Sequence, residues 1–82
     1  MQLVSRFVAE AIAENAYDDN IISDNDESIE VRVVPSSLDM DAIKGYVTHQ
    51  HGCADAAQVD IDDSFKNISL SSDTEITIYW EA

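Results

Sequence analysis

The chain has 82 residues, of which 45% are hydrophobic, and its seventeen Asp and Glu against four Lys and Arg give a net charge of −13. This length predicts a single domain over residues 1–82, and the apolar content argues against a wholly disordered acidic tail. No apolar run approaches the ~18 residues of a membrane span, and so acidic a protein repels nucleic acid and anionic membranes and is drawn to basic surfaces.

The first half of the chain predicts a helix, a loop and a strand. Apolar residues between positions 2 and 16 recur at three- and four-residue spacings, which indicates an amphipathic helix. Residues 18–27 are polar, acidic and rich in Asp and Asn, so we expect a loop there. Residues 28–34 alternate between apolar and polar or charged side chains, as a half-buried strand does.

A second helix is predicted over residues 37–51. Ser36 can cap its N-terminus, with Asp39 reaching back as a short version of the capping box. Gly52 is a plausible C-terminal stop. Gly45 falls on the solvent face of this helix, and nothing in the sequence explains a glycine there.

The last third of the chain predicts three strands. Apolar and polar residues alternate over 59–62 and 76–80, a short apolar pair lies within 68–70, and a Ser-Ser-Asp turn separates the last two. The expected order is α-β-α-β-β-β. We therefore predict an α+β fold in which two helices pack on one face of a mainly antiparallel four-stranded sheet.

Two acidic stretches invite comparison with calcium-binding loops. Counting from Asp24, the sixth position is Ile29, and counting from Asp60 it is Phe65, whereas a calcium loop needs glycine there for its sharp turn. Neither stretch has the bidentate Glu of the twelfth position. The sequence therefore predicts no specific calcium site.

His49, His51 and Cys53 place three potential transition-metal ligands within five residues. Residues two apart on a helix do not face each other, and a structural zinc site takes four protein ligands. The alternative interpretation is a polar helix terminus, where histidine lies near the negative end of the helix dipole. We predict no metal site and no cofactor.

No motif indicates catalysis. Cys53 would need a base and an orienting group to act as a nucleophile, the chain has no glycine-rich phosphate loop, and so small a core makes no sheltered pocket for an acid–base pair. We therefore expect a protein that is not an enzyme. A lone cysteine and the absence of a visible secretory signal predict a cytoplasmic location.

The acidic residues fall into two groups that we predict to contact a partner. The first group occupies thirteen residues of the expected loop and strand, and the second follows Val59. On a strand, Asp60 and Asp62 would project from one face ~6.6 Å apart, a spacing that resembles consecutive phosphates of a nucleic acid. The predicted partner-binding residues are Asp18, Asp19, Asp24, Asp26, Glu27, Glu30, Asp60, Asp62 and Asp63.

Charge density limits this interpretation. A globule of 9.1 kDa exposes about 4,900 Å², so evenly spread acids would give one charge per ~290 Å². Duplex DNA carries a charge every ~1.7 Å of its axis, or about one per 110 Å². Imitation of DNA therefore requires the acids to gather on roughly half of the surface or less.

Small, strongly acidic proteins of this kind resemble phage- and plasmid-encoded inhibitors of host defence, the DNA-mimicking anti-restriction and anti-CRISPR proteins. Eight residues, from Asp39 to Tyr46, are similar to an acidic run followed by Ile-Lys-Gly-Tyr in an acidic anti-CRISPR inhibitor of type I-F systems. The resemblance implies a stoichiometric inhibitor that occupies the basic DNA-binding channel of a nuclease or surveillance complex. It transfers no functional residue to this chain.

The favoured hypothesis is thus a non-enzymatic inhibitor that binds the basic nucleic-acid-binding surface of a host nuclease, restriction enzyme or CRISPR-Cas complex. It would bind no nucleic acid and no membrane itself, and a homodimer could extend an acidic stripe to duplex length. One alternative is an acidic interaction module, such as an antitoxin, an immunity-type protein or an accessory subunit. Another is a surface adapted to high salt, which predicts unfolding at low salt.

Overall fold

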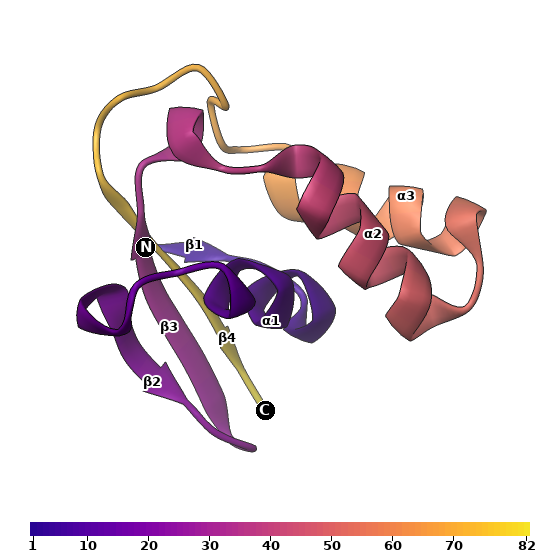
Figure 1. Ribbon diagram of the computed structural model, residues 1–82, viewed down its shortest axis with the longest axis horizontal. Coiled ribbons are helices and arrows are strands. Elements are labelled where there is room, and N and C mark those ends of the chain that lie inside the picture. The colour runs from indigo at the N-terminus through magenta and orange to yellow at the C-terminus, as the bar shows by residue number, and fades with distance from the viewer.

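The computed structural model describes all 82 residues and has an α+β fold with three α-helices and a four-stranded mixed sheet (Figure 1). The sheet order is β1-β4-β3-β2, in which β1 runs parallel to β4 and the other neighbours are antiparallel. In chain order the elements are β1 (Gln2–Leu3), α1 (Arg6–Glu14), the 3-10 turn η1 (Asp18–Asn20), β2 (Ile21–Asp24), β3 (Ser28–Val33), the 3-10 turn η2 (Pro35–Ser37), α2 (Met40–His51), α3 (Ala54–Phe65) and β4 (Ile76–Glu81).

The two central strands form the floor of the core. In the register of β3 with β4, Val31 lies opposite Ile78, and both side chains are fully buried. The predicted alternation of β3 is confirmed, since its apolar side chains point to the helical side. The opposite face carries polar partners such as Arg32 and Thr77, as expected for an antiparallel pair covered on one side only.

Helix α1 lies between the sheet and the other two helices (Figure 1). It starts at an N-cap formed by Ser5, whose Oγ accepts a hydrogen bond of 3.2 Å from the N–H of Val8. Five of its nine residues are buried, three of them alanines whose small side chains permit close approach of both neighbouring layers. The expected fold had two helices on the sheet, whereas here α1 covers it and α2 and α3 pack on α1.

Helices α2 and α3 form an antiparallel pair. Gly52 ends α2 in the left-handed conformation with φ of 71°, which confirms the predicted stop. The start of α2 differs from the prediction, because Asp39 itself is the N-cap and its Oδ1 accepts from the N–H of Ala42 at 3.1 Å. Ser36 belongs instead to η2, so the helix begins at Met40 rather than at residue 37.

The prediction is wrong at the N-terminal end of the first helix, which begins at Arg6 rather than at residue 2. Gln2 and Leu3 form strand β1, and the N–H of Val4 continues this pairing by donating to the carbonyl of Tyr79. Leu3, which the helical spacing placed on the apolar stripe, is 61% exposed. The Ser5 cap and the free edge of β4 together favour a short strand over another helical turn.

The predicted loop over residues 18–27 contains a strand. Ile21 pairs with Val31 and packs against the core, so β2 forms a hairpin with β3. The turn is closed by Asn25, whose Oδ1 accepts hydrogen bonds from the N–H groups of Glu27 and Ser28. Asn and Asp thus make a tight turn and a 3-10 turn here, at either end of a short edge strand.

The strand predicted around residues 59–62 is wrong, because those residues lie in α3. The buried positions Ala57, Ile61 and Phe65 recur every four residues, and Val59 is 64% exposed. The predicted strand at 68–70 and its hairpin with the last strand are also absent, and β4 pairs with β3 and β1. The observed order is therefore β-α-β-β-α-α-β.

The two glycines provide opposite stability tests. An added Cβ meets nothing within 4 Å at either site, so only the backbone distinguishes them. We expect Gly45→Ala to stabilise the protein by about 0.5–1 kcal/mol, because it lies within α2. We expect Gly52→Ala to destabilise it by about 1–2 kcal/mol, because of its positive φ. Urea denaturation measures both, and equal effects of the two substitutions would contradict the αL stop.

Candidate functional site: an acidic hollow beside α1

Four carboxylates surround an open hollow between α1 and the β2–β3 turn. The hollow has a volume of about 380 Å³. We call it the acidic hollow, and it is lined by Arg6, Glu10, Ala13, Glu14, Asp24, Asn25, Asp26, Ile29 and Tyr46.

Local structure places these acids on two sides of the hollow. Glu10 and Glu14 lie one turn apart on α1, and the hydroxyl of Tyr46 reaches Glu10 from α2. Asp24 lies opposite Ile29 in the β2–β3 register, so it faces the helical side of the sheet edge. Asp26 follows in the turn that Asn25 closes.

Arg6 is the one cation in the acidic hollow. Its Nε donates to Glu10 Oε1 at 2.9 Å, and its Nη2 lies 3.9 Å from Asp26 Oδ1. The same guanidinium lies 5.0 Å from the ring centre of Trp80, a half-buried side chain on the inner face of β4. A single charge thus serves two carboxylates, and Glu14 and Asp24 have no basic partner.

The pKa of Tyr46 responds to the negative charges of the acidic hollow. Its hydroxyl donates to Glu10 Oε2 at 3.0 Å, joining α2 to α1. Burial raises the pKa of Tyr46 above 10.0, and the hydrogen bond to Glu10 and the charges of Glu10, Glu14 and Asp24 raise it further. The neutral phenol is therefore the form that the fold stabilises, and this contribution is lost as the pH rises through the raised pKa.

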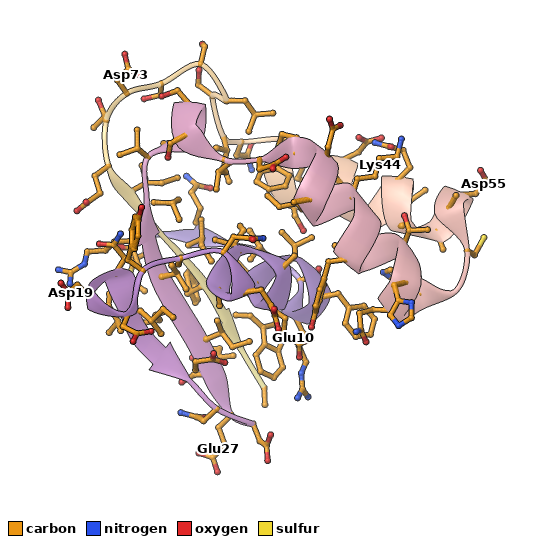
Figure 2. The ribbon with its side chains drawn as sticks, viewed as in Figure 1. Glu10, Asp19, Glu27, Lys44, Asp55 and Asp73 are labelled. Carbon is orange, nitrogen blue, oxygen red and sulfur yellow. The ribbon has the colours of Figure 1, made fainter.

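The other acids of the first predicted group lie around the sheet edge. Asp18 and Asp19 occupy η1 at one end of β2, and Glu27 lies in the turn at its other end (Figure 2). Glu30 projects from the outer face of β3, opposite Tyr79. The structure thus spreads these acids along the β2 edge, and it brings Asp24 and Asp26 together with two residues that the prediction had not included, Glu10 and Glu14.

The second predicted group lies elsewhere. Asp60, Asp62 and Asp63 are on α3, and Figure 1 shows α3 at the opposite side of the molecule from β2. Because residues two apart on a helix diverge, Asp60 and Asp62 do not have the phosphate-like spacing expected of a strand. The nine predicted residues therefore do not form one patch.

Asp60 has a structural role. It is half-buried, its Oδ2 lies 2.7 Å from His51 Nε2, and its Oδ1 accepts a longer hydrogen bond of 3.5 Å from Ser64. The imidazole of His51 in turn contacts Phe7 edge-to-face, with ring centres 4.9 Å apart. These contacts connect all three helices, since Phe7 is on α1, His51 on α2 and Asp60 on α3. His49 is exposed and points in a different direction from His51, as expected for residues two apart on a helix.

The same set does not have the geometry of a catalytic triad. A nucleophilic serine needs the histidine beside it as a base, whereas here the carboxylate stands between His51 and Ser64. Cys53 is exposed at the N-cap of α3, where the N–H groups of Ala56 and Asp55 lower its thiol pKa. No His or carboxylate contact positions a base beside it, and no group of three or more His, Cys, Asp or Glu side chains is arranged to hold a metal ion.

Few of the negative charges are neutralised within the molecule. Only Glu10, Asp26 and Asp60 of the seventeen carboxylates have a basic partner within 4.0 Å. Arg32 donates to the carbonyl of Asp19 rather than to a carboxylate, and Lys44 lies on α2, away from the β2 edge (Figure 2). The sequence signal for Glu10 and Glu14 is that two acids lie one helical turn apart in the first predicted helix, where like charges repel.

Comparison with protein-family models, with curated proteins and with solved structures finds no match. No helix is long and apolar enough to cross a membrane.

The role of Asp60 is testable against a neighbour of equal charge. We expect Asp60→Ala to lower the free energy of unfolding by about 1–2 kcal/mol, because His51 loses its partner. Asp62→Ala removes the same charge from an exposed site of α3, and we expect a change within about 0.5 kcal/mol. Thermal and urea denaturation compare the two, and similar losses would argue against the structural assignment of Asp60.

The electrostatics of the acidic hollow can be measured at Tyr46. We expect Glu10→Gln to lower the pKa of the Tyr46 phenol toward its ordinary value, because it removes the nearest negative charge. Asp24→Asn should lower it less, since Asp24 is the smallest contributor. An alkaline NMR titration of the labelled tyrosine ring gives both values, and a rise in either variant would contradict this arrangement.

Proposed function

We propose that the protein is a non-enzymatic inhibitor that binds the basic nucleic-acid-binding surface of a host-defence nuclease or CRISPR-Cas complex in place of DNA. The observation that carries the proposal is the acidic hollow, where four carboxylates from α1, β2 and the β2–β3 turn surround a single cation that pairs with only two of them. The resemblance of the sequence to acidic inhibitors of host defence supplies the class of partner.

The chemistry of the partner follows from the chemistry of the acidic hollow. Carboxylates and phosphates both accept charge-assisted hydrogen bonds from guanidinium and ammonium groups, and Arg binds either in a bidentate manner. A surface with such an excess of negative charge also accelerates encounter with a positive partner. Arg and Lys of a DNA-binding channel would thus contact Glu14, Asp24 and Asp26 in place of phosphates.

The distribution of acids supports a localised contact surface. Seven of the seventeen carboxylates lie on the C-terminal half of α1, η1, β2 and the β2–β3 turn: Glu10, Glu14, Asp18, Asp19, Asp24, Asp26 and Glu27. The exposed surface of the whole chain is 4999 Å², so the average density remains far below that of DNA. Concentration along this edge raises the local density where a partner would dock.

A pull-down from a lysate of the source cells tests the proposal directly. We expect the tagged protein to retain one basic nuclease or CRISPR-Cas complex at low salt, and duplex DNA or added salt to release it. A partner that DNA cannot displace would replace this proposal with the interaction-module alternative. A protein that unfolds at low salt would instead support adaptation to high salt.

Charge reversal localises the contact surface. We expect the triple variant Asp24→Lys, Asp26→Lys, Glu27→Lys to lose binding and inhibition by at least about tenfold, since each desolvated charge pair contributes about 1 kcal/mol or more. The matched variant Asp62→Lys, Asp63→Lys, Asp73→Lys changes the net charge equally at exposed sites outside the acidic hollow. Titration of the purified partner measures both, and equal losses would contradict a localised surface.

A further inference from the structure

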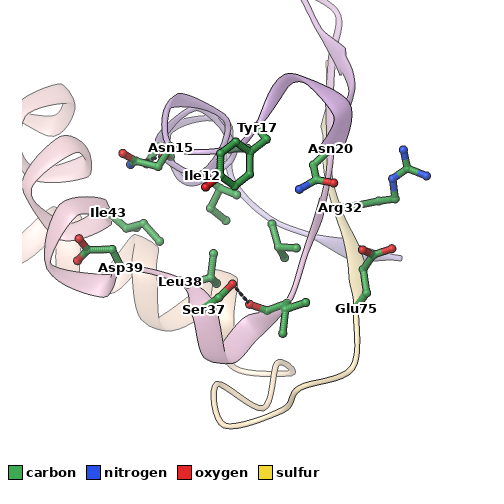
Figure 3. Close-up of a pocket in the computed structure, with 14 residues that line it drawn as sticks. Ile12, Asn15, Tyr17, Asn20, Arg32, Ser37, Leu38, Asp39, Ile43 and Glu75 are labelled. Atoms are coloured by element: carbon green, nitrogen blue, oxygen red, sulfur yellow. Dashed lines mark hydrogen bonds between the residues drawn. The ribbon is translucent and has the colours of Figure 1, made fainter.

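Figure 3 shows a second depression, which lies beside the C-terminal end of α1. It has a volume of about 410 Å³ and lies among the end of α1, η1, the end of β3, η2 and the start of α2. We call it the Tyr17 cavity. Ile12, Asn15 and Ala16 line it, whereas Glu10, Ala13 and Glu14 line the acidic hollow, so the two flank opposite sides of the same helical turns.

The centre of the Tyr17 cavity is apolar. Figure 3 shows Ile12, Leu38 and Ile43 grouped in its middle. Ile12 and Ile43 are 2% and 1% exposed, so they form a fixed floor rather than mobile surface groups. The volume lies within the range of about 300–1,000 Å³ typical of small binding sites, and it is large enough for one aromatic or aliphatic side chain.

Tyr17 stands at the rim of this cavity. It is 84% exposed, the highest value among the large hydrophobic residues, and it immediately precedes the two acids of η1. An exposed aromatic beside an unfilled apolar cavity is the arrangement found at energetically dominant positions of protein interfaces.

The charged side chains of the rim are mainly acidic. Asp39 lies on one side of the apolar centre, and Glu75 and Arg32 lie on the other (Figure 3). The rim thus carries two negative charges and one positive charge. Arg32 donates to the carbonyl of Asp19, and neither rim carboxylate has a basic partner within 4.0 Å. The rim therefore complements cationic groups placed around an apolar insert.

We propose that the Tyr17 cavity receives one aromatic or large aliphatic side chain from a basic segment of the partner, flanked by Lys or Arg that contact Asp39 and Glu75. This inference rests on the proposed function and adds to it a non-ionic anchor. Surface charges accelerate association and select positive partners, but they fix orientation weakly. A filled cavity on the other side of α1 from the acidic hollow sets the register in which the partner docks.

Two synthetic peptides of equal charge distinguish the contribution of the apolar side chain to binding from that of the lysines. Both are blocked pentapeptides with two Lys on each side of a central residue, which is Trp in one and Ala in the other. We expect the Trp peptide to shift the methyl NMR signals of Ile12, Leu38 and Ile43 and to bind about tenfold more tightly than the Ala peptide, because it buries an aromatic side chain. Both peptides should shift the amide signals of Asp24 and Asp26.

Each alternative outcome has a distinct meaning. Equal affinities of the two peptides, with shifts at the amides of Asp24 and Asp26 alone, would overturn the anchor and leave the proposed function standing. No shift at those amides with either peptide would count against the basic partner itself. Equal binding of a Trp peptide flanked by Glu would overturn the basic nature of the segment.

Substitutions in the protein test whether the Trp side chain of the peptide binds in the Tyr17 cavity. We expect Ala16→Leu, which fills the Tyr17 cavity, to abolish the preference for the Trp peptide, and Ala56→Leu on exposed α3 to preserve it. Tyr17→Ala should weaken the Trp peptide several-fold without affecting the Ala peptide. Val59→Ala, which truncates another exposed apolar side chain, is its control. Retention of the preference in both cavity variants would overturn the proposal.

Discussion

The burial of α1 between two layers is the constraint on which the rest of the molecule depends. Val8, Ala9 and Ala11 are completely buried, because the helix contacts β3 and β4 on one side and α2 and α3 on the other. Close packing of this kind permits few substitutions of volume, which explains the alanines. Charged residues of α1 can emerge only along the strip that neither layer covers, and Glu10 and Glu14 do so beside the β2–β3 turn.

Most of the excess negative charge is not paired with basic groups within the molecule. Self-repulsion among the carboxylates opposes compactness. Three ion pairs form: Arg6 with Glu10 within α1, Arg6 with Asp26 between α1 and the β2–β3 turn, and His51 with Asp60 between α2 and α3. They leave fourteen of the seventeen carboxylates without a basic partner within 4.0 Å. A positive partner would relieve the repulsion at the acidic hollow. Association is therefore linked to stability by the same electrostatic term that drives encounter.

The acidic hollow and the Tyr17 cavity flank opposite sides of the C-terminal half of α1. The Tyr17 cavity lies where the chain turns through η1 into β2, and the acidic hollow lies beside the β2–β3 turn at the other end of β2. One provides charge and the other apolar volume with an exposed aromatic at its rim. A partner that contacted both would place basic groups and an apolar side chain on either side of the same helix, which demands a defined orientation.

The sequence by itself determined the α+β class, the apolar faces of β3 and α2, the stop at Gly52 and the excess of acid, because each depends on local pattern or composition. Tertiary structure decided the rest. The residues around Val59 alternate as in a strand, but burial of Ala57, Ile61 and Phe65 against α1 and α2 selects a helix. As a result, the acids of the second group point in different directions around α3 instead of along one face of a strand. Likewise, β1 and β2 exist because the central pair offers hydrogen-bonding edges. Only their pairing brings Asp24 and Asp26 to Glu10 and Glu14, residues distant along the chain whose proximity no local pattern encodes.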